Sequence, residues 1–270
     1  MPELPEVETT RRGIEPHLIG ATINRAVVRN PNLRWPVPAL DPLIAGQTVR
    51  GIERRAKYLL LRFDTGSLLI HLGMSGSLRI VAANAPPRLH DHVDLGFGNR
   101  CLRLHDPRRF GAVLWCDGDD PQQHPRLRDL GPEPLSDAFS GDTLFRASRG
   151  RRVAIKNLIM DNRIVVGVGN IYATEALFHA GIRPGSASQR VARQRLAQLA
   201  FAIKDVLRSA IERGGTTLRD FLGASGSPGY FAQELMVYGR AGETCKRCGT
   251  TIKTKQIGQR ASAYCPSCQR

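Results

Sequence analysis

The sequence is short of acidic residues and of long hydrophobic runs. Among 270 residues, 24 Asp and Glu face 39 Lys and Arg, which gives a formal net charge of +15. Such an excess of positive charge is typical of proteins that bind a polyanion, and nucleic acid is the first candidate. A basic membrane-surface protein is the alternative. The sequence has no basic amphipathic anchor, long apolar run or lipidation motif, so we expect no membrane partner.

The start of the chain also lacks the apolar core of a secretory signal. Charged residues stand there instead: Glu3, Glu6, Glu8, Arg11, Arg12 and Glu15. We therefore expect a cytoplasmic protein with reduced thiols. Hydrophobic residues make up 41% of the chain. Because this share is ordinary for globular proteins, disorder does not explain the composition, and the length allows two domains with real cores.

Cysteine is scarce outside the last 26 residues. Cys101 and Cys116 lie in apolar, strand-like segments, where small core residues are expected. The other four have the spacing C-x2-C-x16-C-x2-C: Cys245, Cys248, Cys265 and Cys268. In a reducing compartment this pattern predicts one structural Zn²⁺, because four thiolates close its coordination sphere. Lys253, Lys255 and Arg260 between the pairs suit phosphate contacts, although a general zinc-ribbon interaction module would look similar.

The first residues, Met1-Pro2-Glu3-Leu4-Pro5-Glu6-Val7-Glu8, suggest an N-terminal nucleophile. Removal of Met1 would expose the secondary amine of Pro2, and an α-amino group titrates near pH ~7.7–8.0. Attack on an aldehyde-like carbon gives a charged iminium that promotes elimination, with Glu3 beside it for proton transfer. A capped helix start with a frayed terminus explains the same residues without any chemistry.

Closely spaced apolar segments follow for about a hundred residues and predict short strands. They are Arg25–Arg29, Thr48–Ile52, Tyr58–Phe63, Ser67–Leu72, Val93–Phe97, Cys101–Leu104 and Ala112–Cys116. Between the N-terminal residues and these strands we expect a helix that Pro16 ends or kinks and Gly20 closes. Such a succession indicates a sandwich or barrel-like domain.

Gly131-Pro132-Glu133-Pro134 is the best domain boundary, because helical periodicity follows it. We expect helices over Arg152–Asp161 and Asn170–Ala180, and a longer one that Gly214-Gly215 terminates. The Gly- and Ser-rich stretch Phe221–Tyr230 reads either as a loop that covers a ligand or as a plain linker.

Seven motifs together resemble the formamidopyrimidine-DNA glycosylases from end to end. Besides the N-terminal residues and the four cysteines they are Arg54-Arg55-Ala56-Lys57-Tyr58, His71-Leu72-Gly73-Met74-Ser75-Gly76, Asp106-Pro107-Arg108-Arg109-Phe110-Gly111, Gly167-Val168-Gly169-Asn170-Ile171-Tyr172 and Gly229-Tyr230-Phe231-Ala232-Gln233-Glu234. The resemblance implies an α+β multidomain fold with DNA between its halves. We expect an N-terminal catalytic β-sandwich with its helix (1–131), a helix–two-turn–helix domain (135–222), a lesion-capping loop and linker (223–238) and a zinc-finger hairpin (239–270).

The resemblance also implies residue roles. A catalytic set comprises Pro2, Glu3, Lys57 and Arg260, in which Pro2 attacks the sugar C1′, Glu3 transfers protons, and Lys57 and Arg260 hold phosphates. Met74 and Phe110 act as apolar wedges in the opened duplex, and Arg108 contacts the orphaned base. The remaining DNA-binding residues that it implies are His92, Arg151, Lys156 and Asn170. Packing at strand ends is the simpler explanation for the wedge residues.

The implied enzyme is a monomeric DNA glycosylase and abasic-site lyase of base excision repair. It would remove 8-oxoguanine and formamidopyrimidines from damaged duplex DNA and cleave the strand by β,δ-elimination. The sister family that resembles endonuclease VIII shares Pro2-Glu3 and the zinc ribbon but prefers oxidised pyrimidines; Leu4, Met74 and the Arg108/Phe110 pair favour the purine branch. A catalytically silent DNA-binding zinc protein is the other alternative, against which Pro2, Glu3 and Lys57 argue together.

Overall fold

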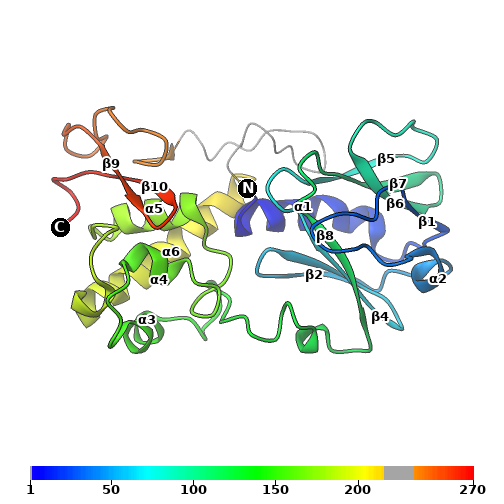
Figure 1. Cartoon of the computed structure of the whole chain (residues 1–270), viewed down its shortest axis with the longest axis horizontal. Helices are drawn as coiled ribbons and strands as arrows, with labels where there is room; N and C mark the ends of the chain where they lie inside the picture. The colour runs from blue at the N-terminus through cyan, green and yellow to red at the C-terminus, as the bar shows by residue number, and fades with distance from the viewer. Residues whose placement is uncertain (1, 216–233) are drawn as a thin grey trace. The chain divides into compact units, whose positions relative to one another are not determined.

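The computed structural model describes residues 2–215 and 234–270, which divide into two compact units (Figure 1). The first unit is formed by the chain up to Arg128 and by residues that follow Glu212, and the second by Asp129–Glu212 and the C-terminal segment. Met1, the predicted loop Phe221–Tyr230 and all but the last residue of the motif Gly229–Glu234 lie outside the described residues. Within the described ranges, none of the helices has the length and apolar character needed to cross a membrane.

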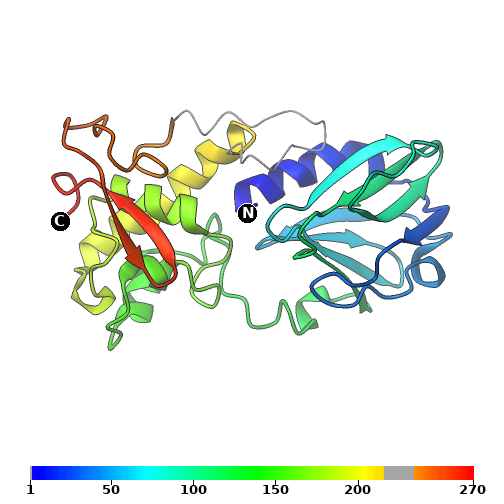
Figure 2. The ribbon, with the colours of Figure 1, turned by 45° about the horizontal axis from the view of Figure 1, so that its top comes forward.

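The first unit is a β-sandwich preceded by a helix. Its elements are α1 (Leu4–Leu18), β1 (Arg25–Val28), α2 (Asp41–Ile44), β2 (Gly51–Arg55), β3 (Tyr58–Arg62), β4 (Gly66–His71), β5 (Ser77–Ala82), β6 (Asp91–Phe97), β7 (Arg100–His105), β8 (Ala112–Asp117) and the short 3₁₀ helix η1 (Pro121–Gln123). Two four-stranded antiparallel sheets have the orders β1-β6-β7-β5 and β2-β3-β4-β8 (Figure 2). Of the sandwich and the barrel-like domain that the strand spacing left open, the structure has the sandwich, which the family resemblance also implies.

The core of this unit lies between the two sheets. Leu61 of β3, Leu68 and Ile70 of β4, and Leu95 of β6 belong to one cluster of buried side chains. The central strands β3 and β4 are buried on both faces, so their sequences read as continuous apolar runs instead of alternating ones. This explains why both strands were recognisable from the sequence alone.

Helix α1 belongs to the same core and fixes the start of the chain. Val7, Ile14 and Leu18 recur at helical spacing, and all three are buried in the core cluster. Pro16 lies within the last turn, and the helix continues to Leu18 before Gly20 takes a left-handed conformation with φ +78°. The first residues of the chain are thereby attached to a rigid body.

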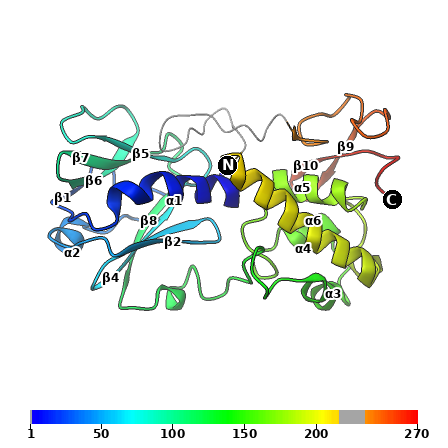
Figure 3. The same ribbon diagram turned by 180° about the vertical axis from the view of Figure 1, so that it is seen from behind.

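The second unit contains four α-helices and a β-hairpin in the described residues. The elements are α3 (Gly141–Ser148), α4 (Ile155–Ile159), α5 (Asn170–His179), η2 (Ser188–Arg190), α6 (Arg193–Glu212), β9 (Lys253–Ile257) and β10 (Arg260–Tyr264). The long helix α6 packs against α3 and α5, as Figure 3 shows from behind. Its buried stripe includes Leu199, Ile203, Val206 and Ala210, as the sequence period predicts.

Three local expectations differ from the structure. The helix expected over Arg152–Asp161 is only the five-residue α4, because Ala154 forms an extended bridge with Ala187 instead of helical bonds. Strand β2 reaches Arg55 because its charged end forms a tight hairpin with β3. The elements β5 and α3 were not predicted, since the charged or polar residues in them obscure the periodicity.

Candidate active site

The N-terminal residues that carry the predicted chemistry are buried at the start of α1. Pro2 and Glu3 are buried, and the carboxylate of Glu6 is fully enclosed. The backbone N–H of Glu3 donates to Glu6 Oε2 at 2.9 Å, which closes one side of a capping box. The sequence pattern Glu3-x-x-Glu6 therefore holds the second and third residues in a defined place.

Lys57 lies in the two-residue turn between β2 and β3. Arg55 pairs with Tyr58, and Ala56 takes a left-handed conformation with φ +54°, as such tight hairpin turns require. Arg54 donates to the carbonyl of Ala56 at 3.0 Å. The hydrogen bond from Arg54 therefore holds the turn that carries Lys57.

Arg54 also connects this turn to α1. Its Nε atom donates to Glu8 Oε2 at 3.2 Å, and both side chains are largely buried. Burial alone would raise the pKa of Glu8, but hydrogen bonds from Arg11 and Arg12 and the charges of Arg11 and Arg54 lower it below its usual value. An ionised Glu8 thus fastens the helix that begins with Pro2 and Glu3 to the turn that carries Lys57.

His71 stands beside this turn and is neutral at ordinary pH. Its ring lies 4.9 Å from that of Tyr58, and its Nδ1 atom accepts the N–H of Gly73 at 3.0 Å. Burial, with the nearby charges of Lys57 and Arg34, lowers the pKa of His71 to about 4. The neutral ring is the form that can accept from Gly73.

The three predicted wedge residues come from two adjacent loops of the first unit. Met74 is 38% exposed and Phe110 45% exposed, which is unusual for large apolar side chains. The Arg108 guanidinium lies over the Phe110 ring at 4.9 Å. This exposed group has the chemistry expected of residues that enter an opened duplex.

Two further residues that were predicted to contact DNA, His92 and Arg151, differ in their exposure to solvent. His92 is buried, and its Nε2 atom lies 2.9 Å from the carbonyl oxygen of Asp106, so its ring is engaged inside the protein. Arg151 is exposed, and its carbonyl accepts the hydroxyl of Ser188 at 2.9 Å. Only Arg151 of these two offers its charged group to solvent.

Lys156 and Asn170 meet the zinc-finger hairpin inside the second unit. The fully buried Lys156 ammonium donates to Asn170 Oδ1 at 2.6 Å, to Ser262 Oγ at 2.6 Å and to the carbonyl of Ala261 at 3.2 Å. Asn170 opens α5, and the exposed Arg260 begins β10. One buried cation therefore joins α4, α5 and the strand that carries Arg260.

The four cysteines converge as their spacing predicts. Their sulfur atoms all lie within 4.8 Å of one another. The Sγ atoms of Cys245 and Cys268 are 3.9 Å apart, and those of Cys248 and Cys265 3.4 Å. Tetrahedral coordination with zinc–sulfur bonds of about 2.3 Å requires sulfur atoms about 3.8 Å apart. The donor set and its size therefore fit one zinc ion.

Two residues that hold these groups in place, Glu175 and Arg54, were not predicted from the sequence. The buried carboxylate of Glu175 accepts the backbone N–H groups of Met236, Val237 and Tyr238 at 2.8, 3.0 and 2.7 Å, which anchors the segment leading into the zinc finger. Arg54 reads in the sequence as one more basic surface residue beside Arg55. The sequence feature that could have pointed to Glu175 is an acidic residue in the otherwise mostly apolar sequence of α5.

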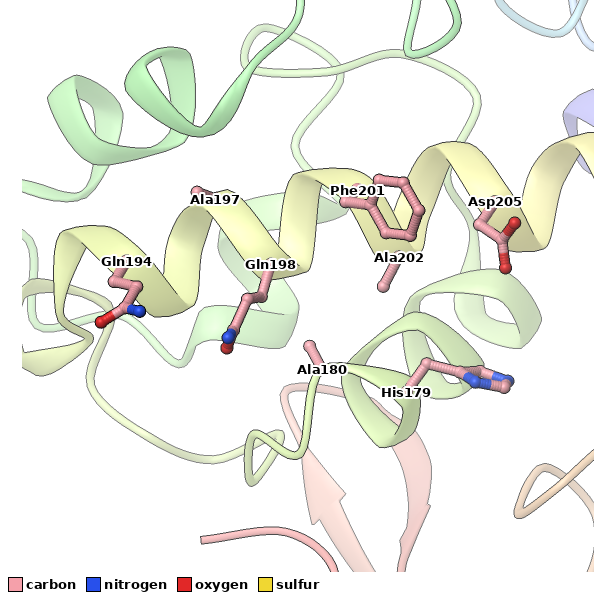
Figure 4. Close-up of a pocket in the computed structure, with 8 residues that line it drawn as sticks. All are labelled: His179, Ala180, Gln194, Ala197, Gln198, Phe201, Ala202 and Asp205. Atoms are coloured by element: carbon pink, nitrogen blue, oxygen red, sulfur yellow. The ribbon is translucent and has the colours of Figure 1, made fainter.

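An open depression of about 670 Å³ lies elsewhere, between the end of α5 and α6 (Figure 4). Phe201, 68% exposed, stands over it with His179, Gln198 and Asp205 around it. Among the described residues, no lysine or arginine and none of the predicted site residues lines it. The side chains that do line it do not suit a phosphate backbone.

The fold and site define a DNA-binding enzyme with a sandwich domain, a helical domain and a four-cysteine finger. Residues 1–113 match the profile of the formamidopyrimidine-DNA glycosylase N-terminal domain, and 130–222 match its H2TH domain. Residues 242–270 match a zinc finger found in FPG and IleRS. The chain belongs to the formamidopyrimidine-DNA glycosylase family, so it is a DNA repair N-glycosylase with abasic-site lyase activity.

Individual relatives match over the whole chain. The formamidopyrimidine-DNA glycosylases of Stutzerimonas stutzeri and Magnetococcus marinus are 58% identical over 272 residues and 59% identical over 274, each with full coverage of both chains. The Lactococcus lactis Fpg bound to DNA with an abasic site has a TM-score of 0.93 at 32% identity, also with full coverage. The Thermus thermophilus MutM (Fpg) structure has a TM-score of 0.89 at 38% identity and covers 99% of this chain and 98% of its own.

The depressed pKa of His71 predicts a specific loss of stability in acid. The unfolded state takes up a proton near pH ~6.5, whereas the folded state resists it until about pH 4. The free energy of unfolding should therefore decrease as pH drops through this window, by on the order of 1–3 kcal/mol more in wild type than in His71→Gln. Urea unfolding between pH 4 and 7 measures this; equal pH slopes for both proteins would contradict the assignment.

Proposed function

We propose that this enzyme excises oxidised purines, namely 8-oxoguanine and formamidopyrimidines, from duplex DNA and cleaves the resulting abasic site by β,δ-elimination. The burial of Pro2 and Glu3 at the start of a firmly seated α1 is the observation that carries the proposal. Solved Lactococcus lactis Fpg structures at 33% identity contain DNA with Fapy-dG, which supports the lesion class. We also propose that the protein acts as a monomer in the cytoplasm.

The proposed chemistry begins when loss of Met1 frees the amine of Pro2. The amine nitrogen bonds to C1′ of the damaged nucleotide, the bond from C1′ to the base nitrogen breaks, and the base leaves with a proton. Opening of the sugar ring gives an iminium whose positive charge makes the C2′ proton acidic. Glu3 is placed to transfer protons at the sugar. Loss of the 3′ and then the 5′ phosphate completes the eliminations, and water releases Pro2.

Lys57 and the second unit supply the proposed phosphate contacts. The Ala56–Lys57 turn carries the Lys57 ammonium, and Arg54 joins this turn to Glu8 of α1. Arg260 and Arg151 are exposed cations, and Asn170 stands at the N-terminus of α5, where backbone N–H groups attract anions. For Lys156 and His92 we propose phosphate contact through the loops that they support, because their own polar atoms are engaged in the protein.

Met74, Phe110 and Arg108 are proposed to fill the duplex after the lesion has been extruded. The exposure of Met74 and Phe110 and the contact of Arg108 with the Phe110 ring support this assignment over packing at strand ends. The exposure of these residues and the Arg108–Phe110 contact do not depend on which base is damaged. The choice between oxidised purines and oxidised pyrimidines is therefore tested by comparing cleavage of DNA that contains each lesion. A damaged pyrimidine cut faster than 8-oxoguanine would favour the endonuclease VIII-like alternative.

The metal in the finger is proposed to be one zinc ion. Cys245, Cys248, Cys265 and Cys268 would hold it, and a sphere of four thiolates fixes the β9–β10 hairpin without offering a position for water or substrate. Arg260 at the start of β10 depends on that hairpin for its place. The metal would therefore serve DNA binding and leave the reaction to the first unit.

Blocking the amine of Pro2 tests the nucleophile. Protein that retains Met1, or carries an N-terminal tag, has an amide at this position and should lose borohydride trapping to DNA and lyase activity, since an amide nitrogen does not form the iminium. DNA affinity should persist, and a C-terminal tag should be much milder. Equal trapping of the blocked protein would identify an internal lysine, such as Lys57 or Lys156, as the nucleophile.

The proposed role of the zinc finger is tested with two variants, one that removes a metal ligand and one that removes a phosphate contact. Cys265→Ser should release zinc and weaken DNA binding, because three thiolates hold the ion less well. Arg260→Ala should keep the metal yet bind abasic-site DNA roughly tenfold more weakly, with a shallower dependence on salt. Zinc content by mass spectrometry and binding by fluorescence anisotropy give both readouts. Wild-type affinity of Arg260→Ala would remove Arg260 from the interface.

A further inference from the structure

Asp106 is a fully buried carboxylate between the two loops that carry the wedge residues. Its Oδ1 atom accepts the hydroxyl of Ser75 at 3.2 Å, and its Oδ2 atom accepts the backbone N–H of Gly111 at 2.7 Å. Ser75 is adjacent to Met74, and Gly111 is adjacent to Phe110. Each carboxylate oxygen therefore holds a neighbour of one wedge residue.

The backbone of Asp106 adds further restraints. Its carbonyl accepts the N–H of Arg109 at 3.2 Å and contacts His92 Nε2 at 2.9 Å, and its N–H donates to the carbonyl of His90 at 3.0 Å. Arg109 has a left-handed φ of +55°, which is unfavourable for a residue with a side chain. The turn after Asp106 is thus held in a conformation that it would not adopt alone.

The two loops touch through their backbones and leave no space for adjustment. A Cβ atom on Gly73, whose φ is +64°, would lie 2.3 Å from the carbonyl carbon of Phe110. A Cβ atom on Gly111 would lie 2.8 Å from the carbonyl oxygen of His71 and 2.9 Å from Asp106 Oδ2. A side chain larger than that of glycine would clash at both contacts, so the two loops pack directly backbone to backbone.

We propose that Asp106 is a positioning residue for duplex opening, which holds Met74 on one loop and Arg108 and Phe110 on the other as a single preformed wedge. This inference rests on the proposed function. A buried carboxylate that accepts hydrogen bonds from both loops keeps them together before DNA binds. The entropic cost of ordering two exposed loops therefore does not reduce the binding free energy. Extrusion of a stacked base breaks stacking and pairing, and a preformed wedge stabilises the opened duplex against the return of that base.

If Asp106 acts in duplex opening and not in the chemical step at Pro2, its removal should affect only substrates in which a base must be extruded. Asp106→Ala removes both acceptors and should slow single-turnover excision of 8-oxoguanine from duplex DNA about 10- to 100-fold, as expected for misplaced positioning groups. Cleavage of a preformed abasic site placed in an unpaired bulge should change less than about threefold, because no base has to be extruded there. Fluorescence of 2-aminopurine beside the lesion should show a slower or smaller opening step.

Matched variants distinguish positioning from general stability. Asp106→Asn can accept from Gly111 through Oδ1 and donate to the Ser75 hydroxyl through its amide, so it should restore most of the excision rate. Ser75→Ala removes one contact and should be intermediate. Asp94→Ala removes another buried carboxylate of the same unit, which lies in β6 and is paired with Arg29 and Arg103, and should lower Tm while leaving the opening step unchanged.

The outcomes are distinct for the two proposals. A normal opening step and excision rate in folded Asp106→Ala would overturn the positioning role, as would an equal loss of excision and bulged-site cleavage. If wild type acted on an oxidised pyrimidine but not on 8-oxoguanine, the proposed lesion class would be wrong. The same variants compared on that pyrimidine would still test the wedge.

Discussion

The proposed chemistry depends on the attachment of the start of the chain to the sandwich. Pro2, the proposed nucleophile, would have a covalent neighbour on one side only after loss of Met1, so α1 would set its place. Val7, Ile14 and Leu18 bury one face of that helix, and the Glu8–Arg54 contact joins it to the turn of Lys57. Because both charges are largely buried, removal of Glu8 would take one carboxylate from Arg54, Arg11 and Arg12 together and should cost more stability than removal of Arg54, after which Arg11 and Arg12 would still pair with Glu8.

The same device recurs wherever a functional segment meets its support. Lys156 in the second unit satisfies three acceptors and joins α4, α5 and β10, whereas Glu175 accepts three backbone N–H groups before the finger. Asp106 does so between the wedge loops. Single buried ions with several partners specify one geometry, since any alternative arrangement leaves a desolvated charge unpaired. In the proposed mechanism, base extrusion would therefore depend on loops that these buried polar side chains hold in place.

Features that depend on local sequence patterns, such as cysteine spacing and apolar runs, were predictable from the sequence. The four cysteines converge as their spacing indicates, and the apolar runs of β3 and β4 became central strands. Contacts between distant residues were not predictable. His92 and Lys156 read as DNA-facing charges, yet their rings and amines are engaged inside the protein, because burial depends on which loops the fold brings over them. The roles of these residues and the domain limits remain predictions.

Locating the covalent bond tests the central claim most directly. The enzyme is reacted with 8-oxoguanine duplex in the presence of borohydride, the adduct is digested with nuclease and protease, and the residue that carries the sugar is read by tandem mass spectrometry. We predict that the sugar lies on the N-terminal peptide, at the nitrogen of Pro2, with Met1 absent. A sugar on Lys57, Lys156 or any other internal amine would contradict the account, because the seating of α1 would then have no part in forming the nucleophile.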